Sequence, residues 1–360
     1  MSKVLVTGAG GYLGRRIARS FLETTDANLV LWMRRGGRED EVREELAAHA
    51  GRCEFAQGDL TDEEPFAGVD PQAIEIVVHA AAVTRFNVER DLAQEVNVEG
   101  LRRLLDWSRR CPQLERLTLL STVYSNGLST GTLREEPLAT PPEFANHYER
   151  SKWHAERVLI HEGGGLPWQI HRIATVIADD VGGRVEQLNA FHKTLELLYY
   201  GLLSVVPGEE GTPLYFITAR FAADAVRELS LLGRERRIYH VSHSRDESAT
   251  LGRLLDVAFE CFHRDPTFRK RRILRPLLCD QTSFDSLSSA ADSFSGPVVG
   301  QSLQSIAPFA PQLFSEKTVA NDSLAHDLRS YSAPDPSGLI ERTCTHLVEA
   351  RFGRREAARA

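Results

Sequence analysis

A glycine-rich run directly after the first apolar segment constrains the fold of this chain more than any other feature. Residues 3–7 are apolar and β-branched, as expected for a strand buried on both faces, and helical spacing of apolar residues begins at Ile17. A glycine turn between a strand and a helix lets backbone N–H groups approach a phosphate, and the helix start adds the positive end of its dipole. The spacing T-G-x-x-G-x-x-G therefore predicts a dinucleotide pyrophosphate site at Gly8, Gly11 and Gly14, against the alternative of a strand–helix turn without a ligand.

Two arginines follow the second expected strand, residues 28–33, and indicate which cofactor is used. Sites that prefer NAD usually place an acidic residue there to accept from the ribose 2′-hydroxyl. Arg34 and Arg35 occupy that place here, and a guanidinium pairs with a 2′-phosphate. NADPH is therefore favoured over NADH. The alternative is a solvated charged turn before an acidic helix at residues 39–45.

Further strands at residues 53–56, 74–79 and 117–121 alternate with helical segments, which predicts an α/β, Rossmann-like, doubly wound parallel sheet. Polar or small residues follow these strands, where such sheets bind ligands. Asp59 and Leu60 suit an adenine. Ala80, Ala81 and Ala82 leave room for adenosine and pyrophosphate. Asn97 is either a structural amide between helix and sheet or a cofactor residue.

A tyrosine and a lysine lie one helical turn apart in the run Tyr148-Glu-Arg-Ser-Lys152, and a hydroxyl, Thr122, ends the fifth strand. A phenol has a pKa of about 10 in water. We expect the Lys152 ammonium, together with the charge of an oxidised nicotinamide, to favour the phenolate and lower the pKa of Tyr148 toward working pH. In the reductive direction the neutral phenol donates a proton. An ordinary exposed helix carrying a Tyr and a Lys is the alternative.

These motifs resemble the extended short-chain dehydrogenases/reductases, and most of all their thioester reductase-like branch. That branch includes fatty acyl-CoA reductases and the terminal reductase domains of carboxylic acid reductases and peptide synthetases. The resemblance runs from Val4 to Val226, and its most specific part is the continuation Y-x-x-S-K-W-x-A-E from Tyr148 to Glu156. Ile173 stands where relatives often have proline.

The resemblance implies the role of each site residue. Thr122, Tyr148 and Lys152 would be the catalytic hydroxyl, the proton donor and the ribose-binding lysine. Arg34 would meet the 2′-phosphate, and Asp59 with Leu60 the adenine. The pyrophosphate would be lined by Thr7, Gly8, Gly11, Tyr12, Leu13 and Gly14.

The implied reaction reduces an acyl thioester, carried on coenzyme A or on a carrier protein, to an aldehyde. Whether a second reduction to the alcohol follows stays open. Two rival functions use the same fold: a nucleotide-sugar epimerase/dehydratase or hydroxysteroid-type dehydrogenase, and a non-catalytic NADP(H)-binding sensor. Sensors typically lose the tyrosine or the lysine, and this chain keeps both.

Composition excludes several other classes. A net charge of −7 argues against a nucleic-acid binder, and five scattered cysteines without a C-x-x-C predict neither a disulfide framework nor a zinc site. The first strand begins at residue 3 and no apolar run reaches membrane-spanning length, so we expect a cytoplasmic protein without signal peptide or transmembrane segment.

The sequence divides into an NADP-binding Rossmann domain, residues 1–178, and a smaller, mainly helical substrate-binding region, residues 179–360, interleaved with late Rossmann elements. Apolar spacing predicts helices over residues 185–201, 251–262 and 339–352. The apolar stripe of the helix expected at residues 185–201 is more typical of a hydrophobic core than of an acyl-chain pocket. The basic residues 269–272 with Arg275 are either a solvated helix end or a docking patch for a carrier protein or coenzyme A. The serine-rich residues 280–304 predict a mobile loop or linker.

Overall fold

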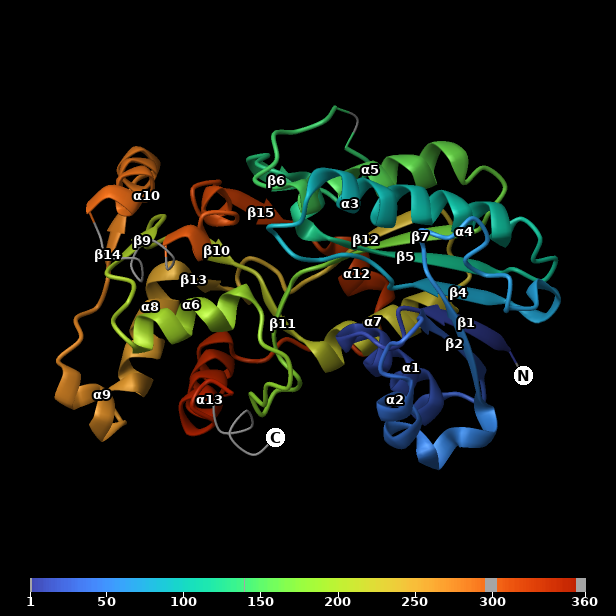
Figure 1. The fold of residues 1–360 in the computed structure, drawn as a ribbon, viewed down its shortest axis with the longest axis horizontal. Coiled ribbons are helices and arrows are strands. Elements are labelled where there is room, and N and C mark those ends of the chain that lie inside the picture. The colour runs from blue at the N-terminus through green and yellow to red at the C-terminus, as the bar shows by residue number, and fades with distance from the viewer. Residues whose placement is uncertain (1, 139, 295–302, 354–360) are drawn as a thin grey trace.

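The computed structural model describes residues 2–138, 140–294 and 303–353, and its centre is a seven-stranded parallel sheet (Figure 1). The strand order is β3-β2-β1-β4-β5-β7-β12, so the direction of winding reverses between β1 and β4. This confirms the predicted doubly wound fold and places the switch point beside the glycine-rich run. The strands are β1 Lys3–Thr7, β2 Asn28–Arg34, β3 Cys53–Gly58, β4 Ile76–His79, β5 Arg116–Thr122, β7 Trp168–Ile173 and β12 Arg237–Val241.

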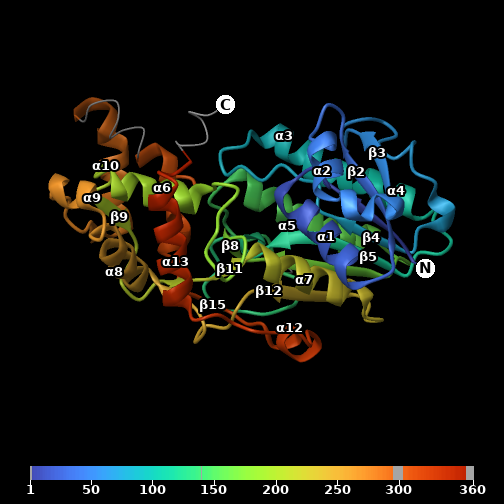
Figure 2. The same ribbon diagram turned by 90° about the horizontal axis from the view of Figure 1, so that it is seen from below.

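Helices cover both faces of this sheet (Figures 1 and 2). On one face, α1 (Tyr12–Thr24) packs against α7 (Ala219–Leu231), and the short α2 (Glu39–Glu45) follows β2. On the other face, α4 (Gly100–Ser108) packs against α5 (His147–Glu162), with α3 (Arg90–Gln94) beside them. Because α7 and β12 come late in the chain, the central layers draw on residues beyond 178.

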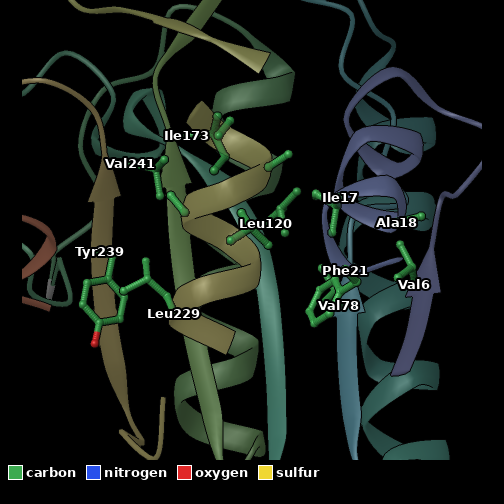
Figure 3. Packing of buried hydrophobic residues seen from close by; sticks show 14 of the residues in the cluster. Val6, Ile17, Ala18, Phe21, Val78, Leu120, Ile173, Leu229, Tyr239 and Val241 are labelled. Atoms are coloured by element: carbon green, nitrogen blue, oxygen red, sulfur yellow. The ribbon is translucent and has the colours of Figure 1, made fainter. Parts of the chain in front are cut away.

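The inner strands are buried on both faces, as their apolar runs predict, whereas the edge strand β3 has exposed residues. In β1, Val4 and Val6 belong to the core under α1 and α7, whereas Leu5 points into the core under α4 and α5. Figure 3 shows the first of these cores, where Ile17 and Phe21 of α1 lie beside strand residues of the sheet.

The C-terminal region forms a second lobe with its own hydrophobic core, in which α8 packs against α13 (Figure 1). Its helices are α6 Ala190–Tyr199, α8 Leu251–Phe262, α9 Pro266–Arg271, α10 Gln281–Phe294 and α13 Pro336–Glu349. The short α12 (Asp322–Asp327) instead packs against β12 of the sheet, and its Leu324 belongs to the core under α1 and α7. Two-strand pairs connect it internally and to the sheet domain: β8 Thr175–Ala178 with β11 Phe216–Thr218, β9 Val205–Pro207 with β14 Leu277–Cys279, β10 Pro213–Leu214 with β13 Ala249–Thr250, and β6 Gly131–Leu133 with β15 Lys317–Val319.

Local capping explains where this lobe differs from the sequence prediction. The helix expected over 185–201 starts only at Ala190, because the Asn189 side chain accepts from the Phe191 N–H and His192 accepts from the Asn189 N–H. The serine-rich segment is not an irregular loop over residues 281–294, which form α10; its residues 295–302 lie outside the described part. Asp280 accepts from the Ser283 N–H at the start of α10.

No helix in the described ranges combines the length and the apolar character needed to cross a bilayer.

Candidate active site

The glycine-rich turn is shaped for close backbone approach. Gly8 has a φ of +70°, and a Cβ there would lie 2.7 Å from the Ala81 nitrogen, so the turn and the segment after β4 are in contact. A Cβ on Gly14 would lie 2.2 Å from the Gly8 carbonyl oxygen, so α1 can pack on the turn only with glycine there. Gly11 caps α1 without a side chain, and the first turn of the helix carries no acidic residue. The cradle fits a pyrophosphate on the N-terminus of α1.

Thr7 and Tyr12 shape this cradle through their side chains. The Thr7 hydroxyl accepts from the Ala81 N–H at 3.2 Å and bonds the His79 ring at 2.8 Å, so it holds the segment after β4. The Tyr12 hydroxyl donates to Asp179, and the Arg16 guanidinium lies 3.9 Å from the centre of the Tyr12 ring and donates to Asp179 at 2.6 Å. The Tyr12 phenol thus connects the turn to the start of the second lobe. Leu13 packs against the core.

The end of β2 leaves one arginine available. Arg35 forms an ion pair with Asp62, whereas the exposed Arg34 guanidinium has no hydrogen-bond or ion-pair partner within the described residues. Asp59 accepts from the Thr61 N–H and hydroxyl; these bonds and the nearby arginines lower its pKa even though its partial burial opposes the shift. Arg34 can therefore meet an anion at this edge.

The small residues after β4 are partly exposed, whereas the Leu60 side chain is buried. Ala80, Ala81 and Ala82 are each half-buried, and the backbone of the first two lies against Gly8. Leu60 is 4% exposed, and a Cβ on Gly100 would lie 2.9 Å from its Cβ. The Leu60 side chain is therefore core packing against α4, which leaves little of it to meet an adenine.

The three candidate catalytic residues converge at the carboxyl end of β5. Thr122 ends that strand, while Tyr148 and Lys152 lie on α5, whose start is capped by Asn146. All three are nearly buried, and a side-chain hydrogen bond joins Tyr148 to Thr122. The Lys152 ammonium donates to the Leu120 carbonyl at 2.6 Å. The structure thus brings together two hydroxyls and one ammonium from two adjacent elements.

The expectation that Lys152 lowers the pKa of Tyr148 is wrong for this structure. Burial raises the pKa of the Tyr148 phenol above its ordinary value, and the bond to Thr122 opposes this only in part. Burial also lowers the pKa of Lys152 to about 8, and its ammonium is engaged with a backbone carbonyl. The phenol is therefore neutral at physiological pH, which is the form that donates a proton.

Asn97 makes contacts that match the structural alternative. Its amide accepts from the Val83 N–H at 2.8 Å, donates to the Val83 carbonyl at 3.0 Å and donates to the Ser151 hydroxyl at 2.8 Å. It lies in a π-helical turn, Glu95–Glu99. Asn97 therefore fastens the segment after β4 to the helix that carries Tyr148.

Sequence reasoning missed a buried ion pair beneath the site. Glu156, two turns after Tyr148 on α5, accepts from Arg172 of β7 through both oxygens, with a shortest distance of 2.7 Å. The same carboxylate accepts from the Ser121 hydroxyl at 2.5 Å and the Ser125 hydroxyl at 2.7 Å. The helical spacing from Tyr148 through Lys152 to Glu156 is the signal that could have found it.

An aromatic cluster contacts the Tyr148 ring through Phe86. Phe86 lies 5.8 Å from it, centre to centre, and also contacts Tyr124 at 6.2 Å and Phe309 of the second lobe at 6.0 Å. Phe86 follows β4, and Tyr124 follows β5. The site is thus apolar around its hydroxyls and receives a side chain from the C-terminal lobe.

The basic cluster divides between paired and exposed side chains. Arg275 pairs with Glu210 at 2.9 Å and Asp256 at 3.0 Å, and Arg271 lies over the Tyr200 ring at 4.9 Å. Arg269, Lys270 and Arg272 are exposed.

The parallel sheet and the glycine cradle at its switch point define a dinucleotide-binding fold of the extended short-chain dehydrogenase/reductase type. The model of an NAD-binding family described as Male sterility protein matches residues 6–226. The chain belongs to this family.

Similar proteins include parts of much longer enzymes. Hybrid PKS-NRPS synthetase traA of Penicillium crustosum is 24% identical over 226 residues, which cover 59% of this chain and 6% of the synthetase. Fatty acyl-CoA reductase 1 of Xenopus laevis is 29% identical over 145 residues, covering 34% of this chain and 28% of that protein. The chain thus matches less than a third of the length of either relative. The crystal structure of the terminal R domain from the myxalamid PKS-NRPS pathway has the same fold, with a TM-score of 0.77 at 21% identity, covering 98% of this chain and 92% of that one.

Proposed function

We propose that this protein reduces an acyl thioester to an aldehyde with NADPH, Tyr148 being the proton donor. The observation that carries the proposal is the buried Thr122–Tyr148 hydroxyl pair, set in an apolar surround in a member of this family. Relatives named for fatty acyl-CoA reduction and for PKS–NRPS synthesis support a thioester substrate, on coenzyme A or on a carrier protein.

The cradle residues would hold the cofactor. The N-terminus of α1 and the glycine turn suit its pyrophosphate, and the exposed Arg34 suits a 2′-phosphate. Lys152 would hold the ribose beside it. When bound, NADPH supplies the hydride that adds to the thioester carbonyl carbon.

Thr122 and Tyr148 then act on the carbonyl oxygen. Both hydroxyls donate hydrogen bonds to it, and these bonds strengthen as negative charge develops there. Because its pKa is raised, the Tyr148 phenol is protonated at neutral pH and transfers its proton to this oxygen. The product is a hemithioacetal. Breaking its carbon–sulfur bond releases the free thiol and the aldehyde.

The test supplies NADPH and a panel of acyl-CoA and acyl-pantetheinyl carrier-protein substrates, and measures cofactor oxidation and free thiol in one reaction. We expect both signals in a fixed ratio. One NADPH per thiol indicates the aldehyde, and two indicate the alcohol. Oxidation without thiol would favour a ketone or nucleotide-sugar substrate instead, and cofactor binding without turnover on any substrate would favour the sensor.

A further inference from the structure

We propose that Lys317 and Gln312, both from the C-terminal lobe, are positioning residues that hold Thr122 and Tyr148 in their catalytic arrangement. The catalytic role in this proposal rests on the function proposed above. The contacts of Lys317 and Gln312 do not depend on which substrate is bound. The two residues lie in a segment to which neither the motifs nor the family match assigns a role, since the match ends at residue 226.

This segment reaches the site from the second lobe and pairs with the sheet domain. Gln312 lies in a short 3₁₀ turn, Ala310–Leu313, and Lys317 begins β15, which pairs in parallel with β6. The two residues are only 7% and 8% exposed. A lysine and a glutamine this deeply buried need polar partners to offset the loss of water.

Lys317 and Gln312 first contact the turn that follows Thr122. The Lys317 ammonium donates to the Gly127 carbonyl at 3.0 Å and to the Gln312 side-chain oxygen, and the Gln312 amide donates to the same Gly127 carbonyl at 3.3 Å. Gly127 ends the 3₁₀ turn Val123–Asn126, has a φ of +55°, and would place a Cβ 2.1 Å from the Glu143 carbonyl oxygen. Two donors from the second lobe therefore fix the end of this turn.

Lys317 and Gln312 also act on Glu149, in the first turn of the helix that carries Tyr148. Glu149 is fully buried and accepts from the Ala145 N–H at 3.0 Å and the Asn146 amide at 3.1 Å. Burial raises the pKa of the Glu149 carboxyl to about 7, and a bond from the Gln312 side chain and the positive charge of Lys317 oppose this shift. Asn146, the cap of α5, also donates to the Pro308 carbonyl at 2.9 Å.

These contacts join two elements, β5 and α5, that are connected in the sequence only by a long segment. Thr122 ends β5, Tyr148 lies in α5, and residues 127–146 run between them. The Lys317–Gln312 pair bridges the Gly127 carbonyl on one side and Glu149 on the other. Lys317 and Glu149 are both buried between the two catalytic elements. Because buried charged groups are often no more stabilising than apolar groups of the same volume, this placement indicates a role in geometry.

The test compares Lys317→Met, Glu149→Gln and their double variant, with Gln312→Met as a second route should Lys317→Met fail to fold. Lys193→Met is the control, because it removes a lysine of the same lobe whose side chain is exposed and pairs with Glu196 instead of with either catalytic element. For each variant we would measure the melting temperature, kcat, the KM for NADPH, and hydrogen exchange in residues 122–128 and 145–152.

Lys317→Met should lower kcat about 10- to 100-fold, since displacing a catalytic group by about 1 Å costs that much. The KM for NADPH should stay within about twofold, because the cofactor cradle is untouched. Hydrogen exchange should accelerate in both segments, and Lys193→Met should change none of these quantities. The double variant removes both buried charges, so its melting temperature should recover while kcat stays low.

A kcat that recovers together with the melting temperature would overturn the proposal, because the cluster would then serve stability alone. Unchanged exchange in both segments would overturn it too. Exchange is measured without any substrate, so absence of thioester turnover in the wild type would refute the proposed reaction and leave the positioning test intact.

Discussion

Arg172 and Glu156 form a fully buried ion pair, with a shortest distance of 2.7 Å, directly beneath the strand end that carries Thr122. Glu156 also accepts hydrogen bonds from the hydroxyls of Ser121 and Ser125, which lie on either side of Thr122. Arg172 also contacts the His240 ring at 3.2 Å, so the pair links α5 to the last strands of the sheet. One carboxylate thus fixes both sides of the catalytic hydroxyl.

Arg172→Met should lower the free energy of unfolding by about 3–5 kcal/mol, because it leaves Glu156 buried without its partner. The double variant Glu156→Leu/Arg172→Met should regain much of this loss. Urea unfolding measures both. As a control, Lys3→Met removes the surface ion pair with Glu54 and should cost less than about 1 kcal/mol. A single variant as stable as the wild type would contradict this account of the pair.

Tyr148→Phe should lower kcat about 10²- to 10⁴-fold, because it removes the donated proton and keeps the ring that packs on Phe86. The affinity for NADPH should change little, since the phenol lies away from the pyrophosphate cradle. Steady-state rates and cofactor titration separate the two effects. If affinity and kcat fell together, Tyr148 would hold the cofactor rather than donate the proton.

Arg34→Ala should weaken NADPH binding about 10- to 100-fold, the value of a charge-assisted hydrogen bond, and leave NADH binding unchanged. Arg35→Ala is the matched control. Its guanidinium already pairs with Asp62, so its loss should matter less for the choice between the two cofactors. Titrating both cofactors into the wild type and the two variants measures this preference. An unaltered preference in Arg34→Ala would contradict the assignment of Arg34 to the 2′-phosphate.

The sequence predicted most of the sheet and the convergence of Thr122, Tyr148 and Lys152, because each feature depends on local pattern. Apolar runs identify strands, glycine spacing identifies the cradle, and an i, i+4 pair identifies one helix face. The partners of the buried polar groups were not predictable in this way. Gln312 and Lys317 reach the site from far along the chain, so no local spacing encodes their contacts. Helical spacing points to Glu156, but it does not identify Arg172 on the next strand as its partner.

The same limit explains the error about Tyr148. The sequence places an ammonium near a phenol, and Coulomb's law alone then lowers the phenol's pKa. Folding buries both groups and directs the Lys152 ammonium to the Leu120 carbonyl, so burial decides the shift. Burial is a property of the whole packed structure.

Binding of NADPH should weaken as the pH rises through about 8. Burial lowers the pKa of Lys152 to about 8, so its ammonium loses its charge above that value and with it the charge-assisted bond to the ribose. Cofactor titration at pH values on both sides of 8 measures the effect. Lys152→Met should bind weakly at every pH, and a wild-type affinity that did not change across this range would contradict the assignment.

Acid should destabilise the fold through its buried histidines, and His243 offers a direct test. Burial lowers the pKa of His79, His171 and His240 to about 3, and that of His192 and His243 to about 4, below the ordinary 6.5. Below pH 6.5 the unfolded chain takes up protons that the folded chain does not, so stability falls as the pH drops from there toward the folded pKa values. Each histidine contributes up to about 1.4 kcal/mol per pH unit in this window.

Neither ring nitrogen of His243 has a hydrogen-bond partner within the described residues, and the ring contacts the tilted Phe221 ring at 4.5 Å, centre to centre. His243→Phe should therefore leave stability at neutral pH unchanged or higher, because it replaces an unsatisfied polar ring with an apolar one of similar shape. It should also remove one histidine's share of the acid loss, which urea unfolding at pH 7 and near pH 5 would measure. An equal loss in the variant and the wild type would mean that His243 is already protonated, or solvated, in the folded protein.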